Sequence, residues 1–504
     1  MKARALLAAL AVVATVRAPV AASSAGLTVG SKAFPESWIL AEALATLIRD
    51  AGVAEVSHRA NLGGTEIVWQ ALESGAVDAY PEYTGTIAQV LLGGTTDASE
   101  SELRERLAAR GIVLSAPLGF NDGYALAMTR ERARALGVRS ISDLAAHAEL
   151  RLALTHEFLG RADGWPGLAR RYGLTLPTPR GIQHELAYQA IASGEADVID
   201  IYTTDAQIEQ LGLAVLDDDR GFFPRYDAVW LYRADLAQRE PRALAAMARL
   251  IGRIDEAAMI RANVRVVLER APYATAAHEL VDAVAGVPRG ADVTHSGWRP
   301  HVVRNVLRHL WLVGVSLAAA VVVGVPLGIA ADRSRAVARG ALALTGLVQT
   351  VPSLALLALL IPLLGIGAAP ALAALFLYSL LPIVRNTLLG FTSVPVPLRE
   401  AADAIGLSPR ARLLRVQLPL AAPAILAGIK TAAVIDVGAA TLAALVGAGG
   451  LGDPILAGIQ LRRADLILEG ALPAAALALL VQWSFDGIER LLVPRALRER
   501  ATQS

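Results

Sequence analysis

Four tyrosines lie in polar loops, three of which contain glycine or proline, and their aromatic faces could hold a cation. The loops read PEYTGT, FNDGYAL, IDIYTTD and GFFPRYD, and they carry Tyr83, Tyr124, Tyr202 and Tyr226. A trimethylammonium group is positive, weakly hydrated and unable to donate hydrogen bonds, so the negative face of a ring attracts it by about 0.5–2 kcal/mol. One such tyrosine could equally be a packing residue. Four together predict a site for a methylated ammonium group.

Charged residues near these loops could bind the rest of such a ligand. Asp122 lies two residues before Tyr124 and could place a carboxylate beside the cation. Lys32 and Arg161 could bind a carboxylate at the other end of the ligand through charge-assisted hydrogen bonds.

A repeated pattern indicates which elements position the tyrosines. Residues 71–86 read ALESGAVDAYPEYTGT, and residues 190–205 read AIASGEADVIDIYTTD. Alignment of the two Ser-Gly pairs places Asp78 on Asp197 and Tyr83 on Tyr202. Each copy is typical of a helix end, a glycine stop, a short strand and a loop. We therefore predict two similar α/β lobes that present a tyrosine at the carboxyl end of a strand and close on a ligand by a hinge.

Composition divides the chain into segments. The sequence has 504 residues, a net charge of +1 and no cysteine, which gives no indication of a nucleic-acid partner and excludes disulfides and thiolate metal sites. We predict a signal peptide at 1–22, with a retained signal anchor as the alternative. The other predicted segments are an extracytoplasmic binding domain at 23–290 (lobe 1 about 23–122 and 227–290, lobe 2 about 123–226), a linker at 291–308, a transmembrane domain at 309–490 and a cytoplasmic tail at 491–504.

Long apolar stretches in the second part predict about five membrane spans. They lie near 309–331, 341–365, 369–390, 418–446 and 466–486. Arginines concentrate in the first and third loops and at the end of the chain, so these regions are expected to be cytoplasmic. Two ionisable residues, Lys430 and Asp436, fall inside the fourth span. Asp436 is a candidate for the solute pathway, or it caps a polar group on a neighbouring helix.

The loop at 391–419 carries the most specific motif of the sequence. It contains EAADAIGLSPRARLLRVQLPLA, in which Glu400, Ala401 and Ala402 are followed by Gly406 and then by Leu418 and Pro419. Small alanines permit close approach, Gly406 permits a tight turn, and Leu418-Pro419 is expected to restart a helix. The motif resembles the EAA signature of ABC importer permeases, which implies a short cytoplasmic helix that docks on an ATPase.

The first half of the chain resembles the binding proteins of osmoprotectant ABC importers. The resemblance rests on GSKAFPE, NLGGTE, YPEYTGT, LGFNDGYALA, THEFLGRADGWPGLA, QHELAYQAIASGEADVIDIYTTDA and DDDRGFFPRYDAV. It implies a type II periplasmic-binding-protein fold followed by an all-α, MetI-like permease. By this resemblance the four tyrosines form an aromatic box beside Asp122, while Lys32, Thr86 and Arg161 hold a ligand carboxylate.

The resemblance leaves the cargo open among glycine betaine, proline betaine, carnitine, choline and ergothioneine, and it implies no cofactor. The sequence contains no Gly-Lys pair and thus no phosphate-binding loop, so we expect a separate cytoplasmic ATPase in two copies. One set of spans per chain favours a homodimer in the bacterial inner membrane, in contact with lipid.

A membrane-anchored sensor and an exported enzyme are the competing function classes. A sensor would need a cytoplasmic output domain, and an enzyme would need a recognisable nucleophile or metal motif.

Overall fold

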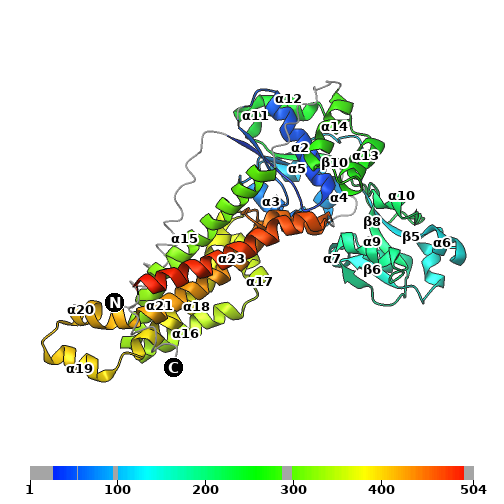
Figure 1. The fold of residues 1–504 in the computed structure, drawn as a ribbon. Coiled ribbons are helices and arrows are strands. Elements are labelled where there is room, and N and C mark those ends of the chain that lie inside the picture. Colours follow the sequence, from blue (N-terminus) through cyan, green and yellow to red (C-terminus); the bar gives the residue numbers. More distant parts are fainter. Residues whose placement is uncertain (1–25, 54, 95–99, 286–297, 462, 493–504) are drawn as a thin grey trace. The chain divides into compact units, whose positions relative to one another are not determined.

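A computed structural model of the chain describes residues 26–53, 55–94, 100–285, 298–461 and 463–492. The described residues form two compact units (Figure 1). One is a mixed α/β unit made of the residues before 286 together with a short segment between residues 459 and 463, and the other is a helical unit made of the remaining residues after 297. The predicted signal peptide, residues 291–297 of the predicted linker and nearly all of the predicted tail lie outside the described residues, whereas the rest of the predicted linker forms the start of a long helix.

The α/β unit contains two five-stranded sheets that share one order of strands. The first sheet has the order β2-β1-β3-β10-β4, and the second has the order β7-β6-β8-β5-β9. In each sheet the strand in fourth place runs antiparallel to both neighbours. The strands are β1 (Leu27–Gly30), β2 (Val56–Arg59), β3 (Ala79–Tyr83), β4 (Ile112–Leu114), β5 (Tyr124–Thr129), β6 (Leu152–Thr155), β7 (Arg180–Ile182), β8 (Val198–Tyr202), β9 (Leu213–Val215) and β10 (Ala228–Arg233).

The repeat predicted from the sequence is confirmed in atomic detail. Helices α3 (Thr65–Glu73) and α9 (His184–Ala192) end at Ser-Gly pairs, and the glycines that follow, Gly75 and Gly194, have φ of +75° and +72°. Asp78 accepts a hydrogen bond from the Thr28 amide, and Asp197 accepts one from the Arg151 amide. Each aspartate therefore joins the start of its tyrosine-bearing strand to the neighbouring parallel strand.

Helices cover both sheets. Helix α2 (Pro35–Asp50) begins at a proline, which suits the first turn of a helix, and it is buried from Pro35 to Ile48 as the core helix of the first lobe. The other helices of this unit are α4 (Thr84–Thr86), a π-helical turn (Ile87–Leu91), α5 (Glu100–Ala108), α6 (Arg130–Leu136), a 3₁₀ turn (Ser142–Ala146), α7 (His156–Gly160), α8 (Trp165–Tyr172), α10 (Gln207–Gln210), α11 (Leu236–Arg239), α12 (Pro241–Ala248), α13 (Glu256–Val267) and α14 (Tyr273–Ala285).

The chain passes twice between the two sheets. Residues 115–123 lead from β4 to β5, and residues 216–227 lead from β9 to β10. The two segments are joined by a β-bridge between Asn121 and Asp227, and the Asn121 side chain accepts a hydrogen bond of 2.7 Å from the Tyr226 amide. Two linked crossings are the expected form of a hinge between lobes.

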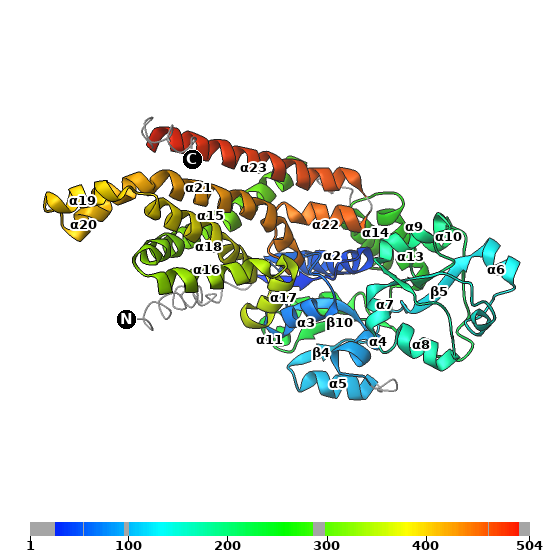
Figure 2. The same cartoon turned by 90° about the horizontal axis from the view of Figure 1, so that it is seen from below.

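The helical unit contains four helices that are long and apolar enough to cross a membrane: Val302–Arg333, Ala368–Thr392, Pro409–Val446 and Ala464–Leu491. They belong to helices that Figure 2 shows running side by side. The helices of this unit are α15 (Trp298–Arg333), α16 (Arg335–Thr350), α17 (Ser353–Leu364), α18 (Ala368–Thr392), α19 (Val396–Ala404), α20 (Pro409–Arg412), a π-helical turn (Leu413–Gln417), α21 (Leu418–Ala439), a 3₁₀ turn (Ala440–Val446), α22 (Gly452–Gln460) and α23 (Ala464–Leu492).

One detail of the predicted spans is wrong. The span predicted at 341–365 is not one straight helix but two, α16 and α17, which meet at 101° and together remain a candidate fifth span. A residue before a proline disfavours the helical conformation, and Val351, just before Pro352, is extended. Helix α21 does begin at Leu418-Pro419 as expected, although a π-helical turn joins it to α20. A wider turn accommodates a proline that lacks an amide proton.

Glycines let the long helices approach closely. A Cβ at Gly328 of α15 would lie 2.5 Å from the Thr387 side chain of α18, and one at Gly428 of α21 would lie 2.6 Å from Asn386 of α18. Because the hydrophobic effect is weak between helices in lipid, such helices associate through close van der Waals packing, which small residues permit. The architecture predicted from the sequence, two similar α/β lobes followed by a helical domain with several apolar helices, is confirmed.

Candidate functional site

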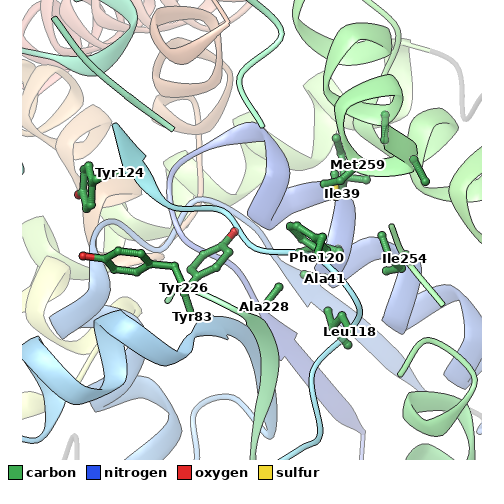
Figure 3. Close-up of a cluster of buried hydrophobic side chains, with 14 of the residues drawn as sticks. Ile39, Ala41, Tyr83, Leu118, Phe120, Tyr124, Tyr226, Ala228, Ile254 and Met259 are labelled. Atoms are coloured by element: carbon green, nitrogen blue, oxygen red, sulfur yellow. The ribbon is translucent and has the colours of Figure 1, made fainter. Parts of the chain in front are cut away.

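The four tyrosines lie where the strands of the two sheets begin or end. Tyr83 is the last residue of β3 and Tyr202 is the last residue of β8. Tyr124 opens β5 and pairs directly with Tyr202 in the antiparallel register. Tyr226 lies on the second crossing, two residues before β10. Figure 3 shows Tyr83, Tyr124 and Tyr226 in one region, although separate segments carry them.

The rings form one connected cluster. The Tyr124 ring lies 5.7 Å from Tyr226 and 5.0 Å from Tyr202, measured between centroids. Tyr83 joins the cluster through Phe34, whose ring lies 6.4 Å from Tyr83 and 6.1 Å from Tyr202. The rings therefore contact one another, and a cation would have to enter between them.

Phe34 is a site residue that the sequence reasoning missed. It lies in GSKAFPE, directly before Pro35, and a residue before proline is expected to be extended. Phe34 has φ of −151° and ψ of 155°, so it stands outside helix α2. This local signal could have shown that Phe34 precedes the helix, but not that its ring meets Tyr202 of the other lobe.

A buried acidic group lies beside the rings. The Asp122 side chain accepts a hydrogen bond of 2.8 Å from the Thr204 hydroxyl, which is also 2.6 Å from Glu36. Glu36 accepts further bonds from the Tyr83 hydroxyl at 2.6 Å and from Asn263 at 3.0 Å. Burial raises the pKa of both carboxyl groups. Asp122 was predicted from the sequence, whereas Glu36 was missed because its partners come from distant segments.

A small cavity of about 20 Å³, which has room for roughly one water molecule, opens onto this acidic group. Its lining includes Phe34, Glu36, Asp122, Tyr202 and Thr204, and thus residues of both lobes. The lining does not include the other three tyrosines. Only one of the four rings therefore faces the cavity next to the carboxylates.

The two cations predicted to bind a ligand carboxylate are both paired within the protein. Lys32 forms a buried ion pair with Glu82, and its Nζ lies 5.3 Å from the centre of the Tyr83 ring. Arg161 donates two bonds to Asp163, at 2.8 and 2.6 Å, and its guanidinium lies 5.4 Å from the centre of the Tyr124 ring. Both cations are thus held against tyrosines of the cluster.

Further contacts connect Arg161 and Thr86 to the cluster. Asp163 also accepts a bond of 2.6 Å from the Tyr226 hydroxyl, which ties Arg161 to a third element. Thr86 is buried in the single-turn helix that follows Tyr83. The neighbouring Gly85 packs so closely that a Cβ there would lie 2.5 Å from the Tyr226 ring.

A serine, a histidine and a glutamate line up elsewhere in the first lobe. The Ser31 hydroxyl lies 2.7 Å from one nitrogen of His58, whose other nitrogen lies 2.8 Å from Glu42. The order resembles that of a hydrolytic triad. Ser31 is wholly buried, however, and is not among the lining residues of the cavities in the described part of the chain. The three groups serve here as a polar link between β1, β2 and α2.

The motif at 391–419 forms two short helices that project from the long helices of the helical unit (Figure 2). Glu400 and Ala401 on α19 are exposed, whereas Ala402 is buried. Gly406 has φ of +77°, the left-handed conformation that favours glycine. Asp403 and Arg412 form an ion pair across this turn. Exposed apolar residues line the same tip: Val396, Leu398, Ile405 and Leu414.

The two ionisable residues of the fourth span have different partners. Lys430 pairs with Asp486 of α23. Asp436 is wholly buried and accepts a hydrogen bond of 2.6 Å from Ser379 of α18, while Ser316 of α15 lies at 3.5 Å. Asp436 thus connects three helices.

Comparisons with known proteins divide the chain in the same way. Residues 25–283 match the family described as the substrate binding domain of ABC-type glycine betaine transport systems. Residues 321–498 match the family described as the inner membrane component of binding-protein-dependent transport systems.

Individual relatives match over about 38% of this chain. The choline transport system permease protein OpuBB of Bacillus subtilis (strain 168) is 42% identical over 190 residues, which cover 38% of this chain and 88% of that protein. The carnitine transport permease protein OpuCB of Listeria monocytogenes is 43% identical over 192 residues, with the same two shares. A crystal structure of a glycine betaine/carnitine/choline ABC transporter aligns with 51% of this chain and 97% of its own, at 28% identity and a TM-score of 0.45.

The chain thus belongs to the family of substrate-binding domains of ABC-type glycine betaine transport systems, and it continues into the inner membrane component of such a system.

Proposed function

We propose that this chain captures a small quaternary-ammonium solute and passes it across the bacterial inner membrane, powered by a separate ATPase. The observation that carries the proposal is the cluster of rings from both lobes beside buried carboxyl groups. The rings attract a cation that has no proton to donate, and each contact contributes about 0.5–2 kcal/mol. The hydrogen-bonded pair of Glu36 and Asp122 adds a negative charge, whose attraction for the cation is strengthened by burial.

The carboxylate of a zwitterionic solute would bind to Arg161, Lys32 and Thr86. Arg161 has five donor N–H groups, of which two bond to Asp163 and one, at 3.2 Å, to Glu157. The remaining donors can meet a ligand without breaking the pair with Asp163. A ligand carboxylate at Lys32 would compete with Glu82. Binding there is expected to cost more than binding at Arg161.

The candidate solutes are glycine betaine, proline betaine, carnitine, choline and ergothioneine. Relatives that are named for choline and for carnitine match the membrane part of this chain to similar extents, so they do not separate these solutes. All five share the trimethylated or dimethylated ammonium group that the rings would hold. The choice among them depends on the groups at the other end.

For the membrane part, we propose that α19 is the contact with the ATPase. Its exposed glutamate and the apolar tip around Ile405 are the surface that such a partner would cover. Two ATPase copies and two copies of this chain would form the complete importer, with lipid around the long helices. The binding domain would lie outside the membrane and the chain end inside. The contacts of Asp436 support a role in joining helices, and a place on the solute pathway is the alternative.

A thermal-shift screen of the full-length chain in lipid nanodiscs tests the proposed cargo. A ligand that binds the folded state raises the unfolding temperature, by a free energy of about 2.7 kcal/mol at a hundredfold excess over the Kd. We expect at least one of the five solutes to raise it, and free glycine and ethanolamine, which lack the methyl groups, to leave it unchanged. No shift with any of the five would contradict the proposal.

A further inference from the structure

Three side-chain oxygens lie close together beside the aromatic cluster, one each from Glu36, Thr204 and Asp122. Their spacing requires a proton on one of the two carboxyl groups. The Thr204 hydroxyl oxygen is 2.6 Å from Glu36 and 2.8 Å from Asp122, and both separations are those of O–H···O hydrogen bonds. A threonine hydroxyl has one proton to donate. The second bond therefore needs a proton on one of the two carboxyl groups.

The other contacts indicate where that proton is. Glu36 accepts bonds from the Tyr83 hydroxyl and the Asn263 amide in addition to Thr204, and several donors stabilise an ionised carboxylate. Within the described part of the chain, the Asp122 side chain accepts hydrogen bonds from Thr204 alone, through its hydroxyl and its amide. Burial raises the pKa of Asp122 well above its usual value, and repulsion by Glu36 and Asp205 adds to this effect. Asp122 is the group that keeps the proton.

Neighbouring charges are already paired. Asp205 lies 3.0 Å from His184 and accepts a bond of 2.5 Å from the Tyr188 hydroxyl. Lys32 pairs with Glu82 on β3, and Glu185 accepts a bond of 3.2 Å from Gln207. Among these described residues, the two cations, His184 and Lys32, are each already paired with another carboxylate, so neither neutralises a second ionised group on Glu36 and Asp122.

The three groups also connect the two lobes. Glu36 lies on α2, against the first sheet, whereas Thr204 follows β8 of the second sheet. Asp122 lies on the first crossing. Through Tyr83, which bonds to Glu36, and Tyr202, two residues before Thr204, the contact determines where two of the site rings lie. We propose that Glu36, Thr204 and Asp122 form a latch that holds the lobes closed on the ligand by sharing one proton.

This inference rests on the proposed function for its ligand, and it makes the closed state sensitive to pH. The raised pKa of Asp122 means that the contact is fully present at low pH and is lost as the pH rises through that value. Loss of the proton would leave two anions against one hydroxyl. Rising pH should therefore open the lobes and release the ligand faster.

The first test compares Thr204→Val with Thr46→Val in the full-length chain in nanodiscs. Thr46 is a buried threonine on the same helix as Glu36, and its hydroxyl contacts Arg49 within one lobe. The probes are radiolabelled glycine betaine and choline. We expect Thr204→Val to speed dissociation by about tenfold or more, since it removes bonds to charged groups, and Thr46→Val to leave the rate unchanged. Equal rates in both variants would overturn the latch.

The second test uses Glu36→Gln, which keeps the shape of the side chain. A glutamine amide can donate to Thr204, whose proton can then go to an ionised Asp122, so no shared proton is needed. We expect dissociation to quicken with pH in the original chain and to quicken much less in the variant, in which the pair of His184 and Asp205 still titrates. A rate independent of pH in the original chain would overturn the shared proton.

Hydrogen exchange separates failure of the latch from failure of the proposed function. If neither probe binds, the cargo is wrong, but the contact between the lobes can still be measured. Amides of residues 200–206 should then exchange faster in Thr204→Val than in Thr46→Val, without any ligand. Equal exchange in the two variants would overturn the latch itself.

Discussion

The ring of Tyr202 packs against three others, at 6.1 Å from Phe34, 5.0 Å from Tyr124 and 4.6 Å from His184. We expect Tyr202→Ala to weaken binding of the solute by about 1–2 kcal/mol, or roughly 5–30-fold, because one cation–π contact is lost. Tyr202→Phe keeps the ring and should bind nearly as well. Calorimetry on the full-length chain measures both. Equal affinity of the alanine variant and the original chain would argue against the aromatic site.

His184 gives the binding domain a pH dependence of its own. Burial lowers the pKa of His184, but the charge of Asp205 and the hydrogen bond to it outweigh burial and raise the pKa from 6.5 to about 10. A raised pKa stabilises the fold fully below pH 6.5, and this contribution is lost as the pH rises toward about 10. We expect the unfolding temperature to fall across this window and His184→Gln to flatten the fall. An identical pH profile in the variant would contradict this assignment.

Sequence reasoning found the tyrosines but not the residues that hold them. The tyrosines were accessible because three of them lie in loops that contain a glycine or proline, and Tyr202 matches Tyr83 in the repeat. Glu36 and Phe34 lie in GSKAFPE, yet their partners, Thr204 and Tyr202, are far away in the chain. Contacts of this kind depend on how the two lobes meet, and no local pattern encodes that.

At the level of elements, helix α19 shows how a loop can be built to meet a partner. Glu400 is exposed on α19, and the ion pair between Asp403 and Arg412 fixes the turn at Gly406. We expect Glu400→Ala to leave solute binding unchanged but to abolish ATP-dependent uptake in proteoliposomes that contain the ATPase. Glu131→Ala, at an exposed glutamate of the binding domain, is the matched control. Normal uptake by the Glu400 variant would refute the coupling role.

The close crossing of α15 and α18 depends on a glycine, which has no side chain. A Cβ at Gly328 would lie 2.5 Å from Thr387 and 3.1 Å from the Val384 carbonyl, whereas a Cβ at Gly340 of α16 would meet nothing within 4 Å. We expect Gly328→Ala to lower the unfolding temperature in detergent and Gly340→Ala to keep or raise it, since alanine favours helices. Equal unfolding temperatures would show that the two helices can separate without cost.

The span predicted at 341–365 shows that hydropathy alone does not predict where a helix is interrupted. Residues 341–365 are predominantly apolar and carry no charge, so a window of that length predicts one helix. Pro352 nevertheless breaks it, and the two pieces meet at 101°. The proline was visible in the sequence, but Pro326, Pro382 and Pro473 lie inside continuous helices. Whether a proline breaks a span depends on neighbours that can satisfy the freed carbonyl groups.

At the scale of the whole molecule, the repeat was the most informative signal. It predicted two similar lobes from a handful of residues, and both sheets have the same strand order. The order itself, with one antiparallel strand in each sheet, was not predictable, because β10 and β5 each follow a crossing between lobes. The junction of a binding domain and a permease in one chain keeps the capture site at a fixed high local concentration near the pathway, which we expect to favour transfer of the solute.

The central claim is that the rings recognise the positive charge of the methylated nitrogen. Pairs of ligands with the same shape but different charge test this claim most directly. Calorimetry on the full-length chain in nanodiscs would compare glycine betaine with tert-butylacetate and choline with 3,3-dimethylbutan-1-ol. In the second member of each pair, carbon replaces the positive nitrogen. We expect at least one cationic member to bind and its neutral-headed partner to bind at least about tenfold more weakly, since several cation–π contacts are lost at once. Equal affinity within both pairs would show that the rings recognise shape alone and would contradict the account.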